Sequence, residues 1–260
     1  MHGSPRTILL IALPLLMPAT TILAQQTRTP VRTPVLVELF TSEGCSSCPP
    51  ADALIARLQH DQPVPNADII VLGEHVDYWD SLGWHDRFSS HDLTERQTEY
   101  AQRLNPEGPY TPQMVVDGVR QFTGNDSAQA LRVIAQSAQT PKLALTLSMP
   151  SLDGNRIKLS VSSASQNLPR ADLIAALVET AASTNVALGE NKGRTLHHVA
   201  IVRDLRKIGT AKQLTSPLFF SFVVPRDAPL ANLRVVVFVQ HPDQGPIVAA
   251  ASTTTQPPVY

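Results

Sequence analysis

The hydrophobic pattern of this chain changes its period once, near Pro141, and the change predicts two kinds of architecture in one polypeptide. Before that point, apolar runs typical of strands alternate with amphipathic stretches typical of helices. The expected strands are 35–41, 68–76, 113–117 and 120–122, and the expected helices are 51–59, 92–104 and 127–138. Alternation of this kind indicates an α/β domain over residues 35–140.

Beyond Pro141 the apolar residues recur at every second position, as in Leu143, Leu145 and Leu147. Further strand candidates are 157–161, 173–178, 197–202, 218–224, 233–240 and 247–251. About seven short strands in a row are typical of a β-sandwich. We therefore expect an all-β, sandwich-like domain over residues 141–260.

The first residues have the pattern of an export signal. Arg6 precedes an apolar run that Pro14 and Pro18 interrupt, and small residues follow up to Ala24. The run is short for a membrane span of about 20 residues, so we interpret 1–24 as a cleaved signal peptide and 25–34 as a linker. The expected location is periplasmic or secreted, with no membrane span after cleavage.

Composition excludes two classes of partner. The formal net charge is −1, and 17% of the residues are charged without forming a block of one sign. Neither a nucleic acid nor an anionic membrane surface is an electrostatic match for such a chain. The 43% hydrophobic content is ordinary for a globular protein.

The two cysteines of the chain form the motif Cys45-Ser46-Ser47-Cys48, between the apolar run 35–40 and the helix-like stretch 51–58. A C-x-x-C motif at a strand-to-helix junction is where a redox-active dithiol is held, one thiol open to attack and the other placed to resolve the mixed disulfide. The alternative is an inert structural disulfide. A four-residue loop constrains the unfolded chain very little, so stability alone is a poor reason to close it.

A second motif, Tyr110-Thr111-Pro112-Gln113-Met114-Val115-Val116-Asp117-Gly118, resembles the segment in which a cis-proline opens the third core strand of thioredoxins and glutaredoxins. The whole chain, including 40–52 and 75–84, resembles a secreted bacterial thioredoxin-like family known as domain of unknown function 1223. The resemblance implies a thioredoxin-like domain in which Cys45 is the nucleophile and Cys48 the resolving thiol. It also implies a cis Pro112 against the sulfurs and a Thr111 backbone that pairs with substrate.

Three residues depart from the pattern of those relatives. Pro49 disfavours helical geometry at Cys48 and predicts a helix that begins at Pro49 itself, farther from Cys45. Glu43 would raise the pKa of a nearby thiol if its carboxylate pointed inward. A single glycine, Gly124, precedes Asn125-Asp126, which favours helix capping there over glutathione binding.

The function that this pattern predicts is an exported thiol-disulfide oxidoreductase acting on protein thiols and disulfides of the cell envelope, without a cofactor. One alternative is a copper- or zinc-binding metallochaperone with Cys45 and Cys48 as ligands together with a histidine. The candidate histidines are His75, His85 and His91. The other alternative is a noncatalytic protein whose sandwich binds an envelope partner.

Two loops complete the set of candidate regions. Aromatic residues concentrate after the second strand at Tyr78, Trp79, Trp84, His85 and Phe88, where we expect them to cover the sheet or pack the next helix. Asp77 and Asp80 lie in the same loop and are candidates for proton transfer to Cys48, with hydrogen bonding or capping the favoured role. The segment 189–194 reads as a hairpin connection with glycines at positive φ, and His197-His198 as the start of a strand with one side chain on each face.

Overall fold

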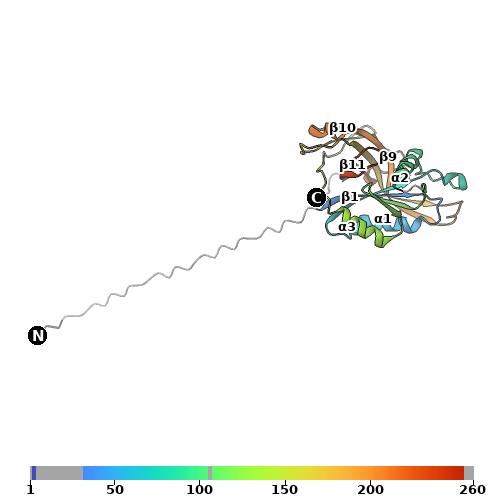
Figure 1. Ribbon diagram of the computed structural model, residues 1–260, viewed down its shortest axis with the longest axis horizontal. Helices are drawn as coiled ribbons and strands as arrows, with labels where there is room; N and C mark the ends of the chain where they lie inside the picture. Colours follow the sequence, from blue (N-terminus) through green and yellow to red (C-terminus); the bar gives the residue numbers. More distant parts are fainter. Residues whose placement is uncertain (1, 4–31, 105–106, 255–260) are drawn as a thin grey trace. The chain divides into compact units, whose positions relative to one another are not determined.

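A computed structural model of the protein describes residues 2–3, 32–104 and 107–254 (Figure 1). Almost all of the predicted signal peptide and linker therefore lies outside the described residues. Within the described part of the chain, no helix is both long and apolar enough to cross a membrane.

The segment before residue 140 contains every strand and helix expected there, with ends within two residues of the predicted ones. Its elements are β1 (Thr33–Thr41), α1 (Pro49–Asp61), β2 (Ala67–His75), η1 (Asp80–Leu82), α2 (His91–Leu104), β3 (Gln113–Val116), β4 (Arg120–Thr123) and α3 (Ser127–Ser137). The Asp126 side chain caps α3 by accepting from the Gln129 N–H at 2.9 Å, as the capping interpretation expected.

The segment after residue 140 consists of strands and three-residue to five-residue 3₁₀ turns. Its elements are β5 (Thr146–Leu147), β6 (Ser151–Asp153), β7 (Arg156–Ser162), β8 (Asp172–Asn185), β9 (Thr195–Thr210), η2 (Ala211–Thr215), β10 (Leu218–Val223), η3 (Leu230–Asn232), β11 (Leu233–Gln240) and β12 (Ile247–Thr254). Strands β8 and β9 extend well beyond the predicted 173–178 and 197–202. The added residues 180–185 of β8 and 203–210 of β9 are half-buried or exposed, so a pattern of apolar residues does not mark them.

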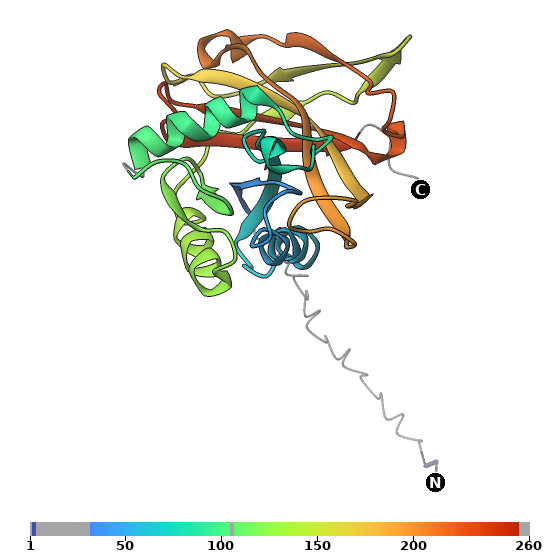
Figure 2. The ribbon, with the colours of Figure 1, turned by 90° about the vertical axis from the view of Figure 1, so that its right-hand side faces the viewer.

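Strands from both sides of residue 140 join one eight-stranded sheet, in the order β12-β11-β8-β9-β2-β1-β3-β4. The pairs β1–β2 and β2–β9 are parallel and the others antiparallel, so the sheet is mixed. A second, antiparallel sheet has the order β10-β7-β5, with β6 paired to β7. The fold is thus mixed α/β, and the expected segments 35–140 and 141–260 share their largest sheet (Figure 2).

Side chains that alternate along β8 divide between two cores. Ile174 and Ala176 belong to the core that includes the buried faces of α1, α3, β1 and β2. Leu173 and Ala175 belong to the core between the large sheet and the second sheet. Because neighbouring strand residues point to opposite faces, one strand stabilises both layers, and each fully buried aliphatic side chain contributes about 1.5–3 kcal/mol.

A buried ion pair links α2 to strands of both halves of the chain. Arg96 of α2 is 5% exposed, and its Nε donates to Glu38 Oε1 of β1 at 2.8 Å. Its other guanidinium nitrogens donate to Gln244 Oε1 at 2.7 Å and Gln240 Oε1 at 3.1 Å. Burial raises the pKa of the neighbouring Glu74 well above its ordinary value, and the Glu38 carboxylate raises it further. Arg96 is therefore held by hydrogen bonds to Glu38, Gln240 and Gln244 in addition to charge pairing.

The two halves of the large sheet meet at a glycine. Strands β2 and β9 pair at one position, Gly73 with Ile201. A Cβ at residue 73 would lie 3.0 Å from the carbonyl oxygen of Val199 and 3.5 Å from that of Ala200. These atoms are backbone and cannot rotate away, so the close approach of β9 to β2 depends on the absence of a side chain.

Replacing Gly73 with valine should separate β2 from β9 and lower the free energy of unfolding by about 1–3 kcal/mol, the usual cost of overpacking. Urea unfolding followed by circular dichroism measures this change. Arg57→Gln, at an exposed position of α1, serves as control and should stay within about 0.5 kcal/mol of the wild type. An equally small effect of Gly73→Val would contradict the proposed steric role.

Candidate functional site

The C-x-x-C turn connects the end of β1 to the start of α1. The Cys45 N–H donates to Ser42 O and the Cys48 N–H to Cys45 O, both at 3.2 Å, so two successive turns reverse the chain. The helix begins at Pro49, as predicted. Proline suits the first positions of a helix, because the backbone N–H that it lacks would have no partner within the helix there.

Cys48 itself differs from the expectation. Its φ of −76° and ψ of −37° are helical, although a following proline disfavours this region. As the N-cap residue, Cys48 accepts at its carbonyl oxygen from the Ala51 N–H at 2.8 Å and the Asp52 N–H at 3.1 Å. The preference before proline is thus overruled by the hydrogen bonds of the first helical turn.

Cys45 and Cys48 form a disulfide with a Cα–Cα distance of 5.4 Å. Both cysteines are buried, whereas Ser46 and Ser47 between them are exposed. Ser47 Oγ lies 3.4 Å from Cys45 Sγ. The pair is therefore reached only from the side of the two serines or after neighbouring side chains move.

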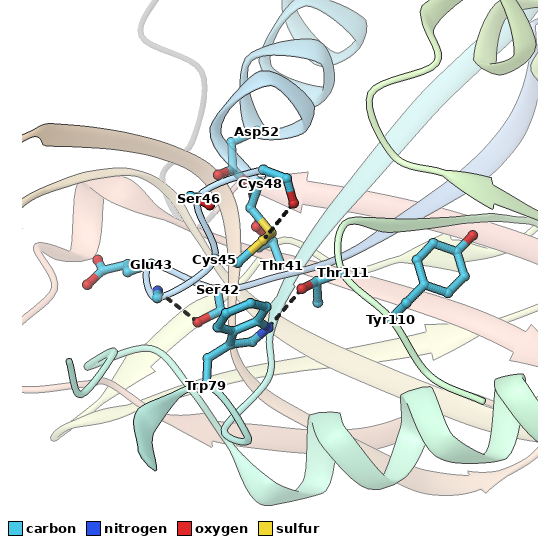
Figure 3. The surroundings of a disulfide bond; sticks show 12 residues. Thr41, Ser42, Glu43, Cys45, Ser46, Cys48, Asp52, Trp79, Tyr110 and Thr111 are labelled. Atoms are coloured by element: carbon cyan, nitrogen blue, oxygen red, sulfur yellow. Dashed lines mark hydrogen bonds between the residues drawn. A yellow bond between two sulfur atoms is a disulfide. The ribbon is translucent and has the colours of Figure 1, made fainter. Parts of the chain in front are cut away.

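The second sequence motif lies beside this disulfide. The Thr111–Pro112 peptide bond is cis, the geometry that the resemblance implies. Thr111 Oγ1 accepts from Trp79 Nε1 at 2.8 Å, and Figure 3 shows both side chains next to the sulfurs. The Gly124 N–H donates to Pro112 O at 2.8 Å, and a Cβ at Gly124 would lie 3.1 Å from Pro112 Cβ and 3.3 Å from Ala51 Cβ. The cis-proline segment thus packs against the first turn of α1.

Five buried ionisable side chains surround the base of the turn. The cluster comprises Glu43, Asp52, His75, Asp86 and His198. His75 Nδ1 and Asp86 Oδ2 are 2.6 Å apart. His198 lies between two carboxylates, with Nε2 3.3 Å from Glu43 Oε1 and Nδ1 3.9 Å from Asp52 Oδ2. The two imidazole rings meet edge to face at 4.8 Å.

Burial and pairing shift the pKa values of these groups in different directions. Burial raises the pKa of Asp86, but His75 and the N–H groups of Glu43 and Phe88 lower it by more, to about 2. Burial lowers the pKa of His75, but Asp86, with Asp52 and Glu43, raises it by more, so the pKa of His75 lies above its ordinary value. Burial dominates at Asp52, whose pKa is raised.

The Glu43 carboxylate turns away from the dithiol (Figure 3). It accepts from Trp84 Nε1 at 2.8 Å and faces His198. Burial raises the pKa of Glu43, but His198, Thr184 and Trp84 together lower it by more, so the pKa lies below its ordinary value. The inward orientation that would raise the pKa of the thiol is not adopted.

The aromatic loop covers this cluster, as the covering interpretation expected. The Phe88 ring packs edge to face on His75 at 5.4 Å and on His198 at 5.9 Å. Tyr78 is 37% exposed and leaves some aromatic surface in solvent near Trp79. The candidate acid Asp77 instead accepts from Thr94 Oγ1 at 2.6 Å, and its role is to hold the start of α2.

The three candidate metal-binding histidines do not gather at the cysteines. His75 pairs with Asp86, His85 with Asp80 at 2.8 Å, and His91 with Asp77 at 3.1 Å. The side chains of His85 and His91 are 78% and 72% exposed. Among the described residues, no group of three or more histidine, cysteine, aspartate and glutamate side chains has an arrangement that suits a metal ion.

Several site residues were not identified in the sequence. Asp52 follows Cys48 by four residues, and this helical spacing would have placed both on one face of α1. His198 was assigned to a strand but not to the site. Glu190 and Asn191 contact the C-x-x-C turn from the loop between β8 and β9, and only the pairing of β9 with β2 brings them there.

The fold and this site define a mixed α/β protein with a buried C-x-x-C disulfide at a helix N-terminus and a cis-proline beside it. The chain belongs to the protein family of unknown function DUF1223, whose model matches residues 36–240. No curated protein matches the chain.

Two solved structures provide comparisons. The X-ray structure of a protein from Agrobacterium tumefaciens is 25% identical, covers 88% of this chain and 97% of its own, and has a TM-score of 0.65. A domain of the outer membrane lipoprotein Omp28 from Porphyromonas gingivalis is 14% identical and covers 44% of this chain and 88% of its own. Its TM-score of 0.27 is too low to indicate a common fold.

The low pKa of Asp86 gives a prediction for stability against pH. The pKa falls from 3.8 to about 2 in the folded protein, so its contribution of about 2 kcal/mol is present above pH 3.8 and lost as the pH falls toward 2. Asp86→Asn should therefore be less stable than wild type near neutral pH, and the difference should shrink in acid. Urea unfolding over this pH range measures it, with Asp61→Asn, whose side chain is 56% exposed, as control. A difference that stays constant with pH would contradict the pairing.

Proposed function

We propose that this protein is an exported thiol-disulfide oxidoreductase that exchanges the Cys45–Cys48 disulfide with protein thiols and disulfides of the cell envelope. The observation that carries the proposal is the position of the pair, at the start of a helix that follows a central strand and beside a cis-proline. In this interpretation the elements from β1 to α3 are a thioredoxin-like unit, and the second sheet packs on the large sheet as in a β-sandwich. The predicted signal peptide supports a periplasmic or secreted location.

The chemistry is two successive thiolate displacements. A substrate thiolate attacks Cys45 Sγ, the Cys45–Cys48 bond breaks, and a mixed disulfide forms while Cys48 leaves as a thiolate and takes up a proton. A second substrate thiolate then attacks the substrate sulfur of the mixed disulfide, which releases Cys45 as a thiolate. Two electrons have passed from the substrate to the protein, and the reverse sequence returns them. Thr111, beside the sulfurs, offers its backbone to an extended substrate.

We infer that Asp52 supplies the proton that Cys48 needs. It lies on the first turn of α1, one turn beyond Cys48, and its Oδ1 accepts from Thr41 Oγ1 at 2.9 Å (Figure 3). Burial raises the pKa of Asp52, so this carboxyl holds a proton at a higher pH than an exposed aspartate does. A buried acid of this kind offsets the cost of forming a thiolate inside the protein.

The proposal is tested by the reduction potential of the pair in glutathione buffers, with thiol state followed by alkylation and mass spectrometry. Wild type should show a reversible transition between about −120 and −270 mV, the range of catalytic exchangers. Cys48→Ser should accumulate a mixed disulfide with glutathione on Cys45, and Cys45→Ser should abolish exchange with protein substrates. A pair that stays oxidised below about −300 mV is a structural disulfide, and that result would contradict the proposed function.

Asp52→Asn should slow reduction of the disulfide at neutral pH by about tenfold or more, since positioned acids contribute at least that much to proton transfer. Stopped-flow tryptophan fluorescence with dithiothreitol measures the rate. The matched control is Asp77→Asn, which removes an acid that holds α2 and should leave the rate unchanged. Equal rates in wild type and Asp52→Asn would exclude Asp52 from the proton transfer.

A further inference from the structure

The loop that joins β8 to β9 closes over the C-x-x-C turn. The Val186 N–H donates to Arg194 O at 3.0 Å, and the Gly193 N–H donates to Val186 O at 2.8 Å. Gly189 and Gly193 adopt φ values of 72° and 81°, as the hairpin interpretation expected. The loop is thus tied at its base and presents its tip in a fixed direction.

Asn191 at the tip holds the backbone on both sides of Gly44. Its side chain is buried, and Nδ2 donates to Glu43 O at 2.9 Å and to Cys45 O at 3.0 Å. Its Oδ1 accepts from Arg194 Nη1 at 2.7 Å, which fixes the orientation of the amide. Both donors of one side chain are therefore committed to the turn that carries Cys45.

Glu190, the residue before Asn191, accepts a hydrogen bond from the backbone N–H that follows Cys45. Its carboxylate accepts from the Ser46 N–H at 3.1 Å, and hydrogen bonding from Ser46 lowers the pKa of Glu190, so the group is charged at neutral pH. The Cys48 N–H is also engaged, with Cys45 O. Of the three backbone N–H groups that follow Cys45, those of Ser46 and Cys48 thus already donate hydrogen bonds in the disulfide form.

A thiolate at Cys45 would be stabilised by unoccupied N–H groups of this turn and destabilised by a nearby negative charge. Glu190 acts against the thiolate in both ways, because it takes up the Ser46 amide and adds an anion. Ser47 Oγ, 3.4 Å from Cys45 Sγ, remains as a donor. Whatever disfavours the thiolate disfavours the reduced form relative to the disulfide.

Building on the exchange activity proposed above, we propose that Glu190 is a positioning residue that shifts the Cys45–Cys48 pair toward the disulfide, so that the reduced protein is a stronger electron donor. Its substrates are then disulfides. The Cys45 thiolate attacks a substrate sulfur, one substrate thiolate leaves, and Cys48 attacks Cys45 to release the second substrate thiol and close the disulfide. A dithiol reductant of the compartment restores the pair by the same exchange in reverse. The C-terminal half thereby contributes to the redox site.

The test is the equilibrium constant of the full chain with reduced and oxidised glutathione, compared between wild type, Glu190→Gln and Glu190→Ala. Glutamine keeps an acceptor for the Ser46 N–H and removes the charge, so its equilibrium should move toward the dithiol by about two- to fivefold in low salt. This shift should fade in 1 M salt, where the screening length falls from about 10 Å to about 3 Å. Glu190→Ala removes the charge and also frees the Ser46 N–H. The shift of its equilibrium toward the dithiol should therefore be larger than that of Glu190→Gln, and the part due to the freed N–H should persist in high salt.

Lys192→Gln is the control, because it removes a charge of opposite sign from the same loop and should not move the equilibrium toward the dithiol. Thermal unfolding of each oxidised variant confirms that the fold is kept. Glu190 variants that match wild type, or that move toward the disulfide, would overturn this inference. If wild type itself does not exchange with glutathione, the proposed function fails instead, so the two failures are distinguishable.

Discussion

The close approach of β9 to β2 is the constraint on which the rest of the structure depends. A Cβ at residue 73 would lie 3.0 Å from the carbonyl oxygen of Val199, so a larger residue would push the two strands apart at this pairing. This junction joins the strands of residues 33–123 to those of residues 172–254 in one sheet. Strand β9 then carries His198 to the base of the C-x-x-C turn, and the loop before β9 carries Glu190 and Asn191 to its outer side. A sheet built from the first half alone would have neither contact.

Charged groups buried across this junction make separation of the halves costly. Arg96 engages Glu38 of β1 and Gln240 of β11, and His198 of β9 lies against Glu43 and Asp52. Removing one member of a buried pair leaves an uncompensated charge and costs about 3–5 kcal/mol, although the intact pair contributes little net stability. Such pairs therefore specify one arrangement of the strands more than they add to its stability.

The stability of a thiolate at the cysteine pair depends on how many backbone N–H groups at the start of the helix are free to bind it. Helix N-termini stabilise thiolates through free N–H groups. Here the helix begins with two prolines that lack this group, and the Ser46 and Cys48 amides of the preceding turn are already engaged. Burial of both cysteines acts in the same direction, because a thiolate is less favourable away from water. Each of these features favours the disulfide over the dithiol.

The sequence by itself determined the local elements, the C-x-x-C turn and the helix start at Pro49, because these depend on hydrophobic period, proline chemistry and short motifs. The cis geometry at Pro112 was implied by the resemblance to thioredoxins and glutaredoxins. Sequence periodicity did not reveal that β9 pairs with β2, since a parallel pairing between residues 73 and 201 leaves no local signal. For the same reason, Asn191 read as a turn residue and His198 as a strand residue. Only the tertiary structure decided that they lie at the disulfide, because long-range strand pairing, and not local preference, sets which distant side chains meet.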